Sequence, residues 1–324
     1  SKEHNIRLRE LAIRQGLKLN EYGVFRSETE ERVAGASEEK VYSALGLPWI
    51  PPPLREDRGE IQAAQEGRLP RLVEWRHLQG DLHVHSHWSD GAFSIEEMAR
   101  AALERGYAYI LIADHSKSLG VAKGLDEARL QQQREEISAL NERLARETEG
   151  RFQVLSGIEV DILGDGGLDL AEEMLASLDF VVASVHSRLK MEPEAMTERL
   201  LKAIRSGVVD VIGHPTGRLL NEREGYEFDL ERVSEACAEE GVALELNASP
   251  QRLDLRDIQA RMAKERGVKI VLSTDAHRPE QLDFMLFGVG TAQRAWLEPE
   301  DVLNTLPAEA LLEWRQRRLR RRRR

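Results

Sequence analysis

The sequence predicts an α/β protein built on a distorted seven-stranded (β/α)7 barrel of the TIM type. From residue 81 onward, short segments rich in Val, Ile and Leu alternate with helical patterns. These segments are apolar on both faces, as buried parallel strands are. Seven parallel strands alternating with helices imply a closed or nearly closed barrel, with an open doubly wound sheet as the alternative. The expected strands are residues 82–85, 109–113, 153–160, 180–185, 209–212, 243–246 and 269–272.

Helical patterns separate the expected strands. Ser94 and Glu97 have the spacing of a capping box, which predicts a helix that ends at Gly106. Glycine also follows several of the other helical patterns, where a turn into the next strand favours positive φ. The remaining helices of this part are expected at residues 126–148, 194–205, 229–240 and 255–266.

Residues 1–58 have a different pattern and are too few to close a core alone, so we expect a small separate segment. It should contain a helix at residues 3–15, extended chain at 17–25 and a second helix at 38–45, followed by a proline-rich stretch. Residues 59–80 are charged and mixed, which favours a linker with one short helix near 60–66. The barrel domain is then expected at residues 81–310 and an arginine-rich tail at 311–324.

Composition excludes several classes of protein. The chain has 324 residues, 41% hydrophobic and 32% charged, which is ordinary for a globular protein and too apolar for disorder. It has no apolar run of the length that crosses a membrane, about 18 residues or more. The single cysteine, Cys237, excludes a disulfide framework and fits a reducing cytoplasm. The chain lacks an apolar signal core and an initiator Met, so we expect a processed chain or a fragment in the bacterial cytoplasm.

The charge is unevenly distributed. The net charge is −11, but eight arginines lie in the last ten residues, so the preceding 314 carry −19. Such a body excludes a protein that coats nucleic acid through a generally basic surface. We expect a helix to end near Trp314 and a flexible basic arm to follow, which either holds phosphates or only aids solubility.

Histidines and acids follow the expected strands one after another. In a parallel barrel the carboxyl ends of all strands meet at one face, where active sites are built. One buried histidine at a strand end is usually structural, but a whole series would bury many polar groups together without partners. The pattern therefore predicts a polynuclear metal site. Its candidate ligands are His83, His85, Asp90, His115, Glu159, His186, His214, Asp275 and His277.

These motifs resemble those of the polymerase-and-histidinol-phosphatase (PHP) family. The matching runs are DLHVHS at 81–86, SDG at 89–91, ADHS at 113–116, GIEV at 157–160, SVH at 184–186, GHP at 213–215 and STDAH at 273–277. The resemblance implies the PHP fold with a trinuclear centre. One ion would be held by His83, His85, Glu159 and Asp275, a second by Glu159, His186 and His214, and a third by Asp90, His115 and His277. It also implies that His87 is not a ligand. Asp114 directly precedes a candidate ligand, and we expect it to support the site rather than bind metal.

Imidazoles and carboxylates suit Zn²⁺, Mn²⁺ or Fe²⁺, and the resemblance favours Mn²⁺. The expected nucleophile is a metal-bound water activated by the three divalent ions, with no Ser or Cys nucleophile. Arg188, Arg218 and Arg252 follow strand ends, where they either clamp phosphate or remain solvated.

The first segment indicates the substrate. Residues 1–25 and 42–56 resemble the thumb of family X DNA polymerases, and the order thumb, linker, PHP domain resembles the C-terminal half of bacterial family X polymerase/exonucleases. The polymerase palm is missing from this chain, so we do not expect nucleotidyl transfer. The expected activity is hydrolysis of DNA 3′ ends in the 3′→5′ direction, with 3′-phosphate removal and cleavage at abasic sites as related reactions. The expected partners are gapped or single-stranded DNA and upstream polymerase domains, with no membrane.

Two other hypotheses remain open. One is a small-molecule phosphomonoesterase of the histidinol-phosphate phosphatase type. The other is a non-catalytic module that organises a polymerase or docks on DNA. Loss of several ligands would indicate such a module, and every expected ligand position is occupied.

Overall fold

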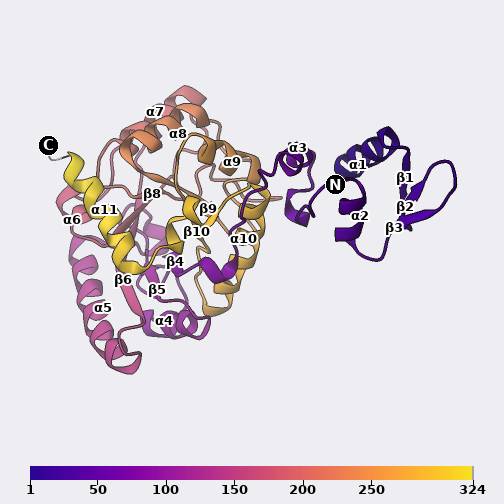
Figure 1. Ribbon diagram of the computed structural model, residues 1–324. Helices are drawn as coiled ribbons and strands as arrows, with labels where there is room; N and C mark the ends of the chain where they lie inside the picture. Colours follow the sequence, from indigo (N-terminus) through magenta and orange to yellow (C-terminus); the bar gives the residue numbers. More distant parts are fainter. Residues whose placement is uncertain (323–324) are drawn as a thin grey trace. The chain divides into compact units, whose positions relative to one another are not determined.

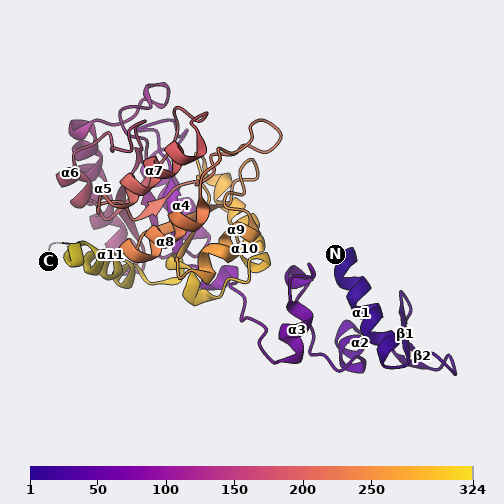
Figure 2. The same ribbon diagram turned by 90° about the horizontal axis from the view of Figure 1, so that it is seen from above.

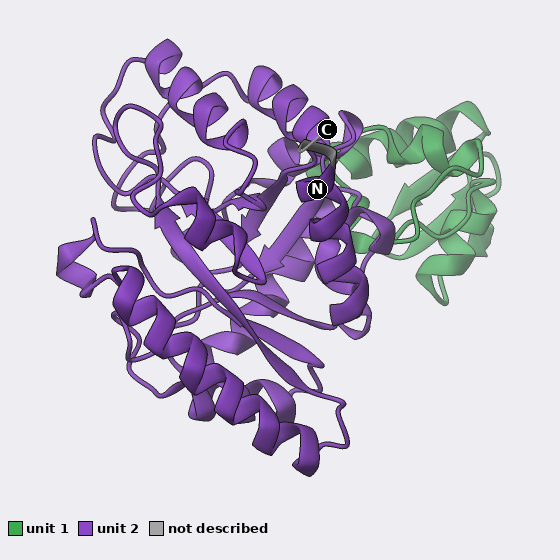
Figure 3. Cartoon of the chain, turned by 90° about the vertical axis from the view of Figure 1, so that its left-hand side faces the viewer, with its two compact units in different colours: residues 1–72 green, residues 73–324 purple. Residues whose placement is uncertain are grey.

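The computed structural model describes the backbone of residues 1–322 and the side chains of residues 1–320. It contains two compact units, which divide between Leu72 and Val73 (Figure 3). The expected linker is shared between them. Its short helix is present as α3 (Glu60–Gln65) in unit 1, whereas Val73 is fully buried in the core of unit 2.

Unit 1 combines helices with a small antiparallel sheet. Besides α3 it contains α1 (Lys2–Arg14), β1 (Leu17–Asn20), β2 (Gly23–Arg26), β3 (Arg32–Ala34) and α2 (Glu38–Ala44). The strands pair in the order β1-β2-β3, of which β3 was not predicted. A buried histidine joins the three helices: Nδ1 of His4 lies 2.5 Å from Oε1 of Glu60, and Nε2 lies 2.8 Å from the hydroxyl of Tyr42.

Unit 2 is a nearly closed parallel barrel. Its strands are β4 (Gly80–Val84), β5 (Tyr109–Ile112), β6 (Gln153–Asp161), β7 (Phe180–Ser184), β8 (Val211–Ile212), β9 (Ala243–Asn247) and β10 (Ile270–Ser273), which pair in chain order. A parallel bridge between Val84 and Ala276 joins the first strand to the chain that leaves the last. The amide of His85 donates to the carbonyl of Ala276 at 2.8 Å. The predicted barrel is therefore confirmed, and the open sheet is excluded.

Helices surround the strands (Figure 1). They are α4 (Ile95–Glu104), α5 (Glu127–Glu147), α6 (Glu172–Ala176), α7 (Pro193–Ile204), α8 (Leu230–Glu240), α9 (Asp257–Glu265) and α10 (Met285–Arg294). Both views place α7 beside α8 (Figure 2). The capping box is present as predicted, with Ser94 accepting from the amide of Glu97. Helices α6 and α10 were not predicted.

The barrel interior is apolar at the end where the strands begin. Phe180, at the first position of β7, is fully buried and stacks on Trp314, with ring centroids 6.3 Å apart. Trp314 belongs to the last helix, α11 (Ala308–Arg322). Since Phe180 begins its strand, α11 covers the end of the barrel opposite to the carboxyl ends of the strands.

The flexible basic arm expected from residue 315 is not found in the described part of the tail, because α11 continues through it. The side chains of Arg315 and Arg318 are 5% and 7% exposed and both contact the buried Asp210. This acid precedes β8 and lies more than 100 positions earlier in the chain, so nothing local in the sequence indicates the pairing. The side chains of Arg321 and Arg322, and all of residues 323–324, lie outside the described part. No helix among the described residues is long and apolar enough to cross a membrane.

Candidate metal centre

The nine predicted ligands gather at the carboxyl ends of the barrel strands. His83 is part of β4 and His85 follows it, while Glu159 is near the end of β6 and faces into the barrel mouth with them. The others lie in the segments that follow β4, β5, β7, β8 and β10. Because the carboxyl ends of parallel barrel strands meet at the same face, residues almost 200 positions apart become neighbours.

Glu159 is the centre of the cluster. Its carboxylate is 1% exposed, and five imidazoles approach it from four other strands. Two of these are close: Nδ1 of His115 lies 2.8 Å from Oε2, and Nε2 of His214 lies 2.9 Å from Oε1. The remaining three nitrogens lie 3.3–3.7 Å from a carboxylate oxygen and belong to His83, His85 and His186. Such a carboxylate can bridge two ions.

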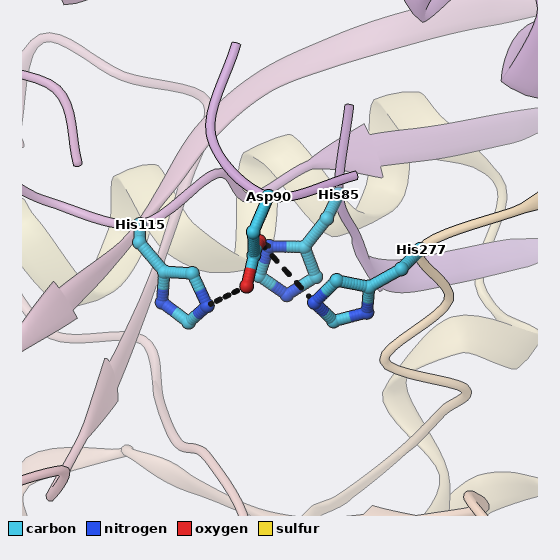
Figure 4. A group of neighbouring side chains, drawn as sticks. All are labelled: His85, Asp90, His115 and His277. Carbon is cyan, nitrogen blue, oxygen red and sulfur yellow. Dashed lines mark ion pairs between the residues drawn. The ribbon is translucent and has the colours of Figure 1, made fainter. Parts of the chain in front are cut away.

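A second group of side chains includes Asp90 (Figure 4). Ligand atoms of His85, Asp90, His115 and His277 lie within 4.8 Å of one another. Oδ2 of Asp90 is 3.5 Å from Nε2 of His115, and Oδ1 is 3.3 Å from Nε2 of His277. The picture shows both rings directed toward the carboxylate of Asp90.

Two further groups have the same compactness. His83, His85 and Glu159 form one, and His115, Glu159 and His186 form the other. His115 thus belongs to two groups, one at each of its ring nitrogens. Asp275 joins the first group through its Oδ1, which lies 3.0 Å from Nε2 of His85.

The polar atoms of this cluster fit divalent cations. In the described part of the chain, six of its buried atoms have no hydrogen-bond partner. They are Nε2 of His83, both ring nitrogens of His85, Nδ1 of His115, Oε2 of Glu159 and Nδ1 of His214. Nδ1 of His115 and Oε2 of Glu159 are close, but their angles are not those of a hydrogen bond. Unpaired buried polar atoms are costly unless something coordinates them, and this donor set suits Mn²⁺, Zn²⁺ or Fe²⁺.

The surroundings also favour ionised carboxylates. Burial by itself raises the pKa of Glu159, but His115, His186 and His83 together lower it well below its ordinary value. The pKa of Asp90 is lowered in the same way: burial raises it, but the hydrogen bonds from His115 and His277 and the charges of His85 and His115 together lower it well below its ordinary value. His85 has a pKa lowered to about 3, first by burial and then by its cationic neighbours His277 and His115. A neutral His85 beside anionic carboxylates is in the state that binds a metal.

Three acids outside the nine candidate ligands contact those ligands or the loop that carries one. Asp114 accepts from the hydroxyls of Ser86 and Ser89, which holds the loop that carries Asp90. Asp161 lies 3.2 Å from Nδ1 of His186, and Glu245 lies 2.7 Å from Nδ1 of His83. The sequence analysis missed these last two. Glu245 could have been noticed as the lone acid inside an otherwise apolar strand.

The three candidate arginines lie in different surroundings. Arg252 is at the cluster, with its Nε 3.3 Å from Oδ2 of Asp275. Arg218 instead donates to the backbone carbonyls of Arg252 and Leu253, so it holds that loop. Arg188 is exposed and lies against Gly164. His87, the third histidine of the run, is exposed and belongs to none of the three groups.

Comparison with known proteins divides the chain in the same way. The DNA polymerase beta thumb family matches residues 1–56, and the PHP domain family matches residues 81–249. The chain is 45% identical over 304 residues to the DNA polymerase/3'-5' exonuclease PolX of Bacillus subtilis (strain 168), covering 94% of this chain and 52% of that protein. It thus spans about half the length of PolX.

Shorter relatives match the barrel. A probable phosphatase of Caldanaerobacter subterraneus subsp. tengcongensis is 33% identical over 244 residues, covering 72% of this chain and 85% of that protein. A probable phosphatase of Thermoanaerobacter sp. (strain X514) is 32% identical over 238 residues, covering 69% of this chain and 89% of that protein. The chain therefore belongs to the PHP family, with a polymerase beta thumb segment preceding its PHP domain.

Proposed function

We propose that this chain is a metal-dependent phosphodiesterase that hydrolyses DNA 3′ ends in the 3′→5′ direction. The observation that carries the proposal is the convergence of Glu159 and eight other candidate ligands, in a chain that is 45% identical to a polymerase/3'-5' exonuclease. The thumb-like unit 1 favours DNA over a small phosphate ester as the substrate. Removal of 3′-phosphates and cleavage at abasic sites would use the same centre.

The nine residues would hold three divalent ions, with Mn²⁺ as the working ion and Zn²⁺ or Fe²⁺ as alternatives. When bound, such ions activate water for attack on phosphorus and neutralise the phosphate oxygens. Glu159 would bridge two of them, because imidazoles approach both of its oxygens. Asp90, His115 and His277 would hold the third.

The chain's own side chains would then position the substrate. Arg252 is the arginine next to the centre, and a guanidinium can donate two parallel hydrogen bonds to a phosphate. Arg218 would act indirectly, because its donors are used on the backbone of the loop that carries Arg252. Arg188, at the exposed rim, is proposed as an outer phosphate contact.

The test is release of mononucleotides from 3′-labelled single-stranded and gapped DNA in Mn²⁺. Glu159→Ala and His83→Ala should each reduce release by at least 10²-fold. The matched control is His87→Ala, which removes an exposed imidazole of the same run and should retain full activity. Equal activity in a His83→Ala, Glu159→Ala double variant would refute the proposal.

The second candidate is a small-molecule phosphomonoesterase. It is favoured by the probable phosphatases, of which this chain covers 85% and more. The two functions differ in the substrate that is turned over with the higher kcat/KM. Faster hydrolysis of histidinol phosphate than of DNA ends would select the phosphomonoesterase.

A further inference from the structure

We propose that Glu245 is a positioning residue of the metal centre, which fixes the tautomer of His83 and the backbone of His214. This inference rests on the proposed metal centre. It concerns an acid that the sequence analysis did not identify and that none of the three ligand groups contains.

Four donors surround the carboxylate of Glu245, which is completely buried in β9. Oε1 lies 2.7 Å from Nδ1 of His83 and also accepts from the hydroxyl of Ser273. Oε2 accepts from the backbone amide of His214 at 2.5 Å and from the side-chain amide of Asn247 at 3.2 Å. One carboxylate thus contacts two expected ligands from different strands.

Through Asn247, Glu245 is also linked indirectly to a third expected ligand, Asp275. The amide nitrogen of Asn247 also lies 3.2 Å from Oδ2 of Asp275. His214 has a positive φ of 26°, a conformation that costs a non-glycine residue free energy and needs support from its surroundings. The hydrogen bond from its backbone amide to Glu245 provides such support.

The arrangement decides which nitrogen of His83 is free. Because Glu245 carries no proton to donate, Nδ1 of His83 must donate, and its hydrogen stays on that nitrogen. In a neutral, metal-bound His83, Nε2 would then carry the lone pair, and it is directed toward Oε2 of Glu159 at 3.4 Å. A ligating histidine held in this way by an acid on its other nitrogen is oriented and made more basic.

Glu245 itself is not a ligand in this arrangement. Its two oxygens accept four hydrogen bonds, which use the lone pairs that a metal would need. Its role is therefore to act through His83, His214 and Asn247.

Replacing Glu245 by Gln tests the positioning role of Glu245. A Gln amide has one oxygen and one NH₂ group, so it cannot accept hydrogen bonds both from His83 and from His214 with Asn247. If the new NH₂ faces His214 and Asn247, it meets two donors. If it faces His83, then Nδ1 must accept, so the proton moves to Nε2 and blocks the ligating nitrogen. Either orientation harms the centre while keeping the shape of the side chain.

The experiment measures Mn²⁺ binding to the full chain by calorimetry, without substrate. Glu245→Gln should weaken binding roughly 10- to 100-fold. The matched control, Glu239→Gln, changes an exposed acid on the preceding helix α8 and should leave Mn²⁺ affinity unchanged. A folded Glu245→Gln protein that binds Mn²⁺ within twofold of wild type overturns the inference. Wild-type protein that binds no Mn²⁺ overturns the metal centre itself, and the inference with it.

A measurement on the unaltered side chain decides the matter if Glu245→Gln does not fold. Nitrogen-15 spectra of the Zn²⁺-loaded wild-type protein, with His83 assigned by its loss in His83→Gln, report which ring nitrogen carries the proton. A protonated Nδ1 with a metal-bound Nε2 is expected. A metal-bound Nδ1 in His83 refutes the role of Glu245 even if the metal centre is real.

Discussion

Asp210 and Arg315 form a buried ion pair that joins the C-terminal helix to the barrel. Nε of Arg315 lies 2.7 Å from Oδ2 of Asp210, and their side chains are 5% and 0% exposed. Arg318 contacts the other carboxylate oxygen. The same helix places Trp314 on Phe180, so α11 completes the apolar interior at this end of the barrel.

Replacing Asp210 by Ala should destabilise the protein by about 3–5 kcal/mol, because two buried guanidinium groups would lose their counter-charge. Urea unfolding measures the change. The matched control is Arg317→Ala on the same helix, where the side chain is 78% exposed and the expected change is below about 0.5 kcal/mol. Deletion of residues 315–324 should also destabilise the barrel. Unchanged stability after that deletion would restore the interpretation of the tail as a separate arm.

Gly91→Ala should weaken metal binding at the Asp90 group roughly tenfold, the lower end of the range for supporting positions. A Cβ at Gly91 would lie 2.7 Å from the backbone of Ser86, so the loop would have to shift. The next amide, of Ala92, donates to the carbonyl of His277, and the shift would therefore move both Asp90 and His277. Mn²⁺ titration monitors the binding. Gly120→Ala is the control, since a Cβ there meets no atom within 4 Å; equal affinity in both variants would contradict the prediction.

Arg252→Ala should raise the KM for DNA ends about 10- to 100-fold, the effect of losing one hydrogen bond between charged groups. Mn²⁺ affinity should change little if Arg252 binds the substrate phosphate rather than supporting the metal ligands. The opposite result, weaker Mn²⁺ binding with an unchanged KM, would show that Arg252 serves only Asp275, its neighbour at 3.3 Å. Steady-state kinetics and calorimetry on the same preparation separate the two, with Arg317→Ala as the control.

In unit 1, Glu38 should titrate far below its ordinary pKa of 4.5. Hydrogen bonds from Arg55, and then from Trp49, lower the pKa of Glu38 to about 2. A lowered carboxyl pKa stabilises the fold above the unfolded-state pKa, and this contribution is lost as the pH falls from about 4.5 to about 2. An NMR titration of the side-chain carboxyl gives the midpoint, and Arg55→Gln should move it back toward 4.5. A wild-type midpoint already near 4.5 would contradict this prediction.

Most of the barrel was predictable because each strand can be recognised from the residues of its own short segment. Each is a short, mostly apolar run, most have a helical pattern after them, and the observed strands begin and end within two residues of the expected ones. Helix α6 was missed because it has only five residues, and α10 because it contains two glycines, Gly288 and Gly290, and continues directly from a 3-10 helix at Pro279–Phe284. The third strand of unit 1 was missed because three largely exposed residues leave no apolar pattern.

The sequence alone determined the barrel and the nine candidate ligands, because strand ends in a parallel barrel converge whatever the helices between them do. The tertiary structure decided what depends on partners far away in the chain. It showed that Glu245 contacts His83 across 162 positions. It also showed that Arg315 and Arg318 are buried against Asp210. A buried charge is tolerable only with its partner, and the partner is known only once the chain has folded.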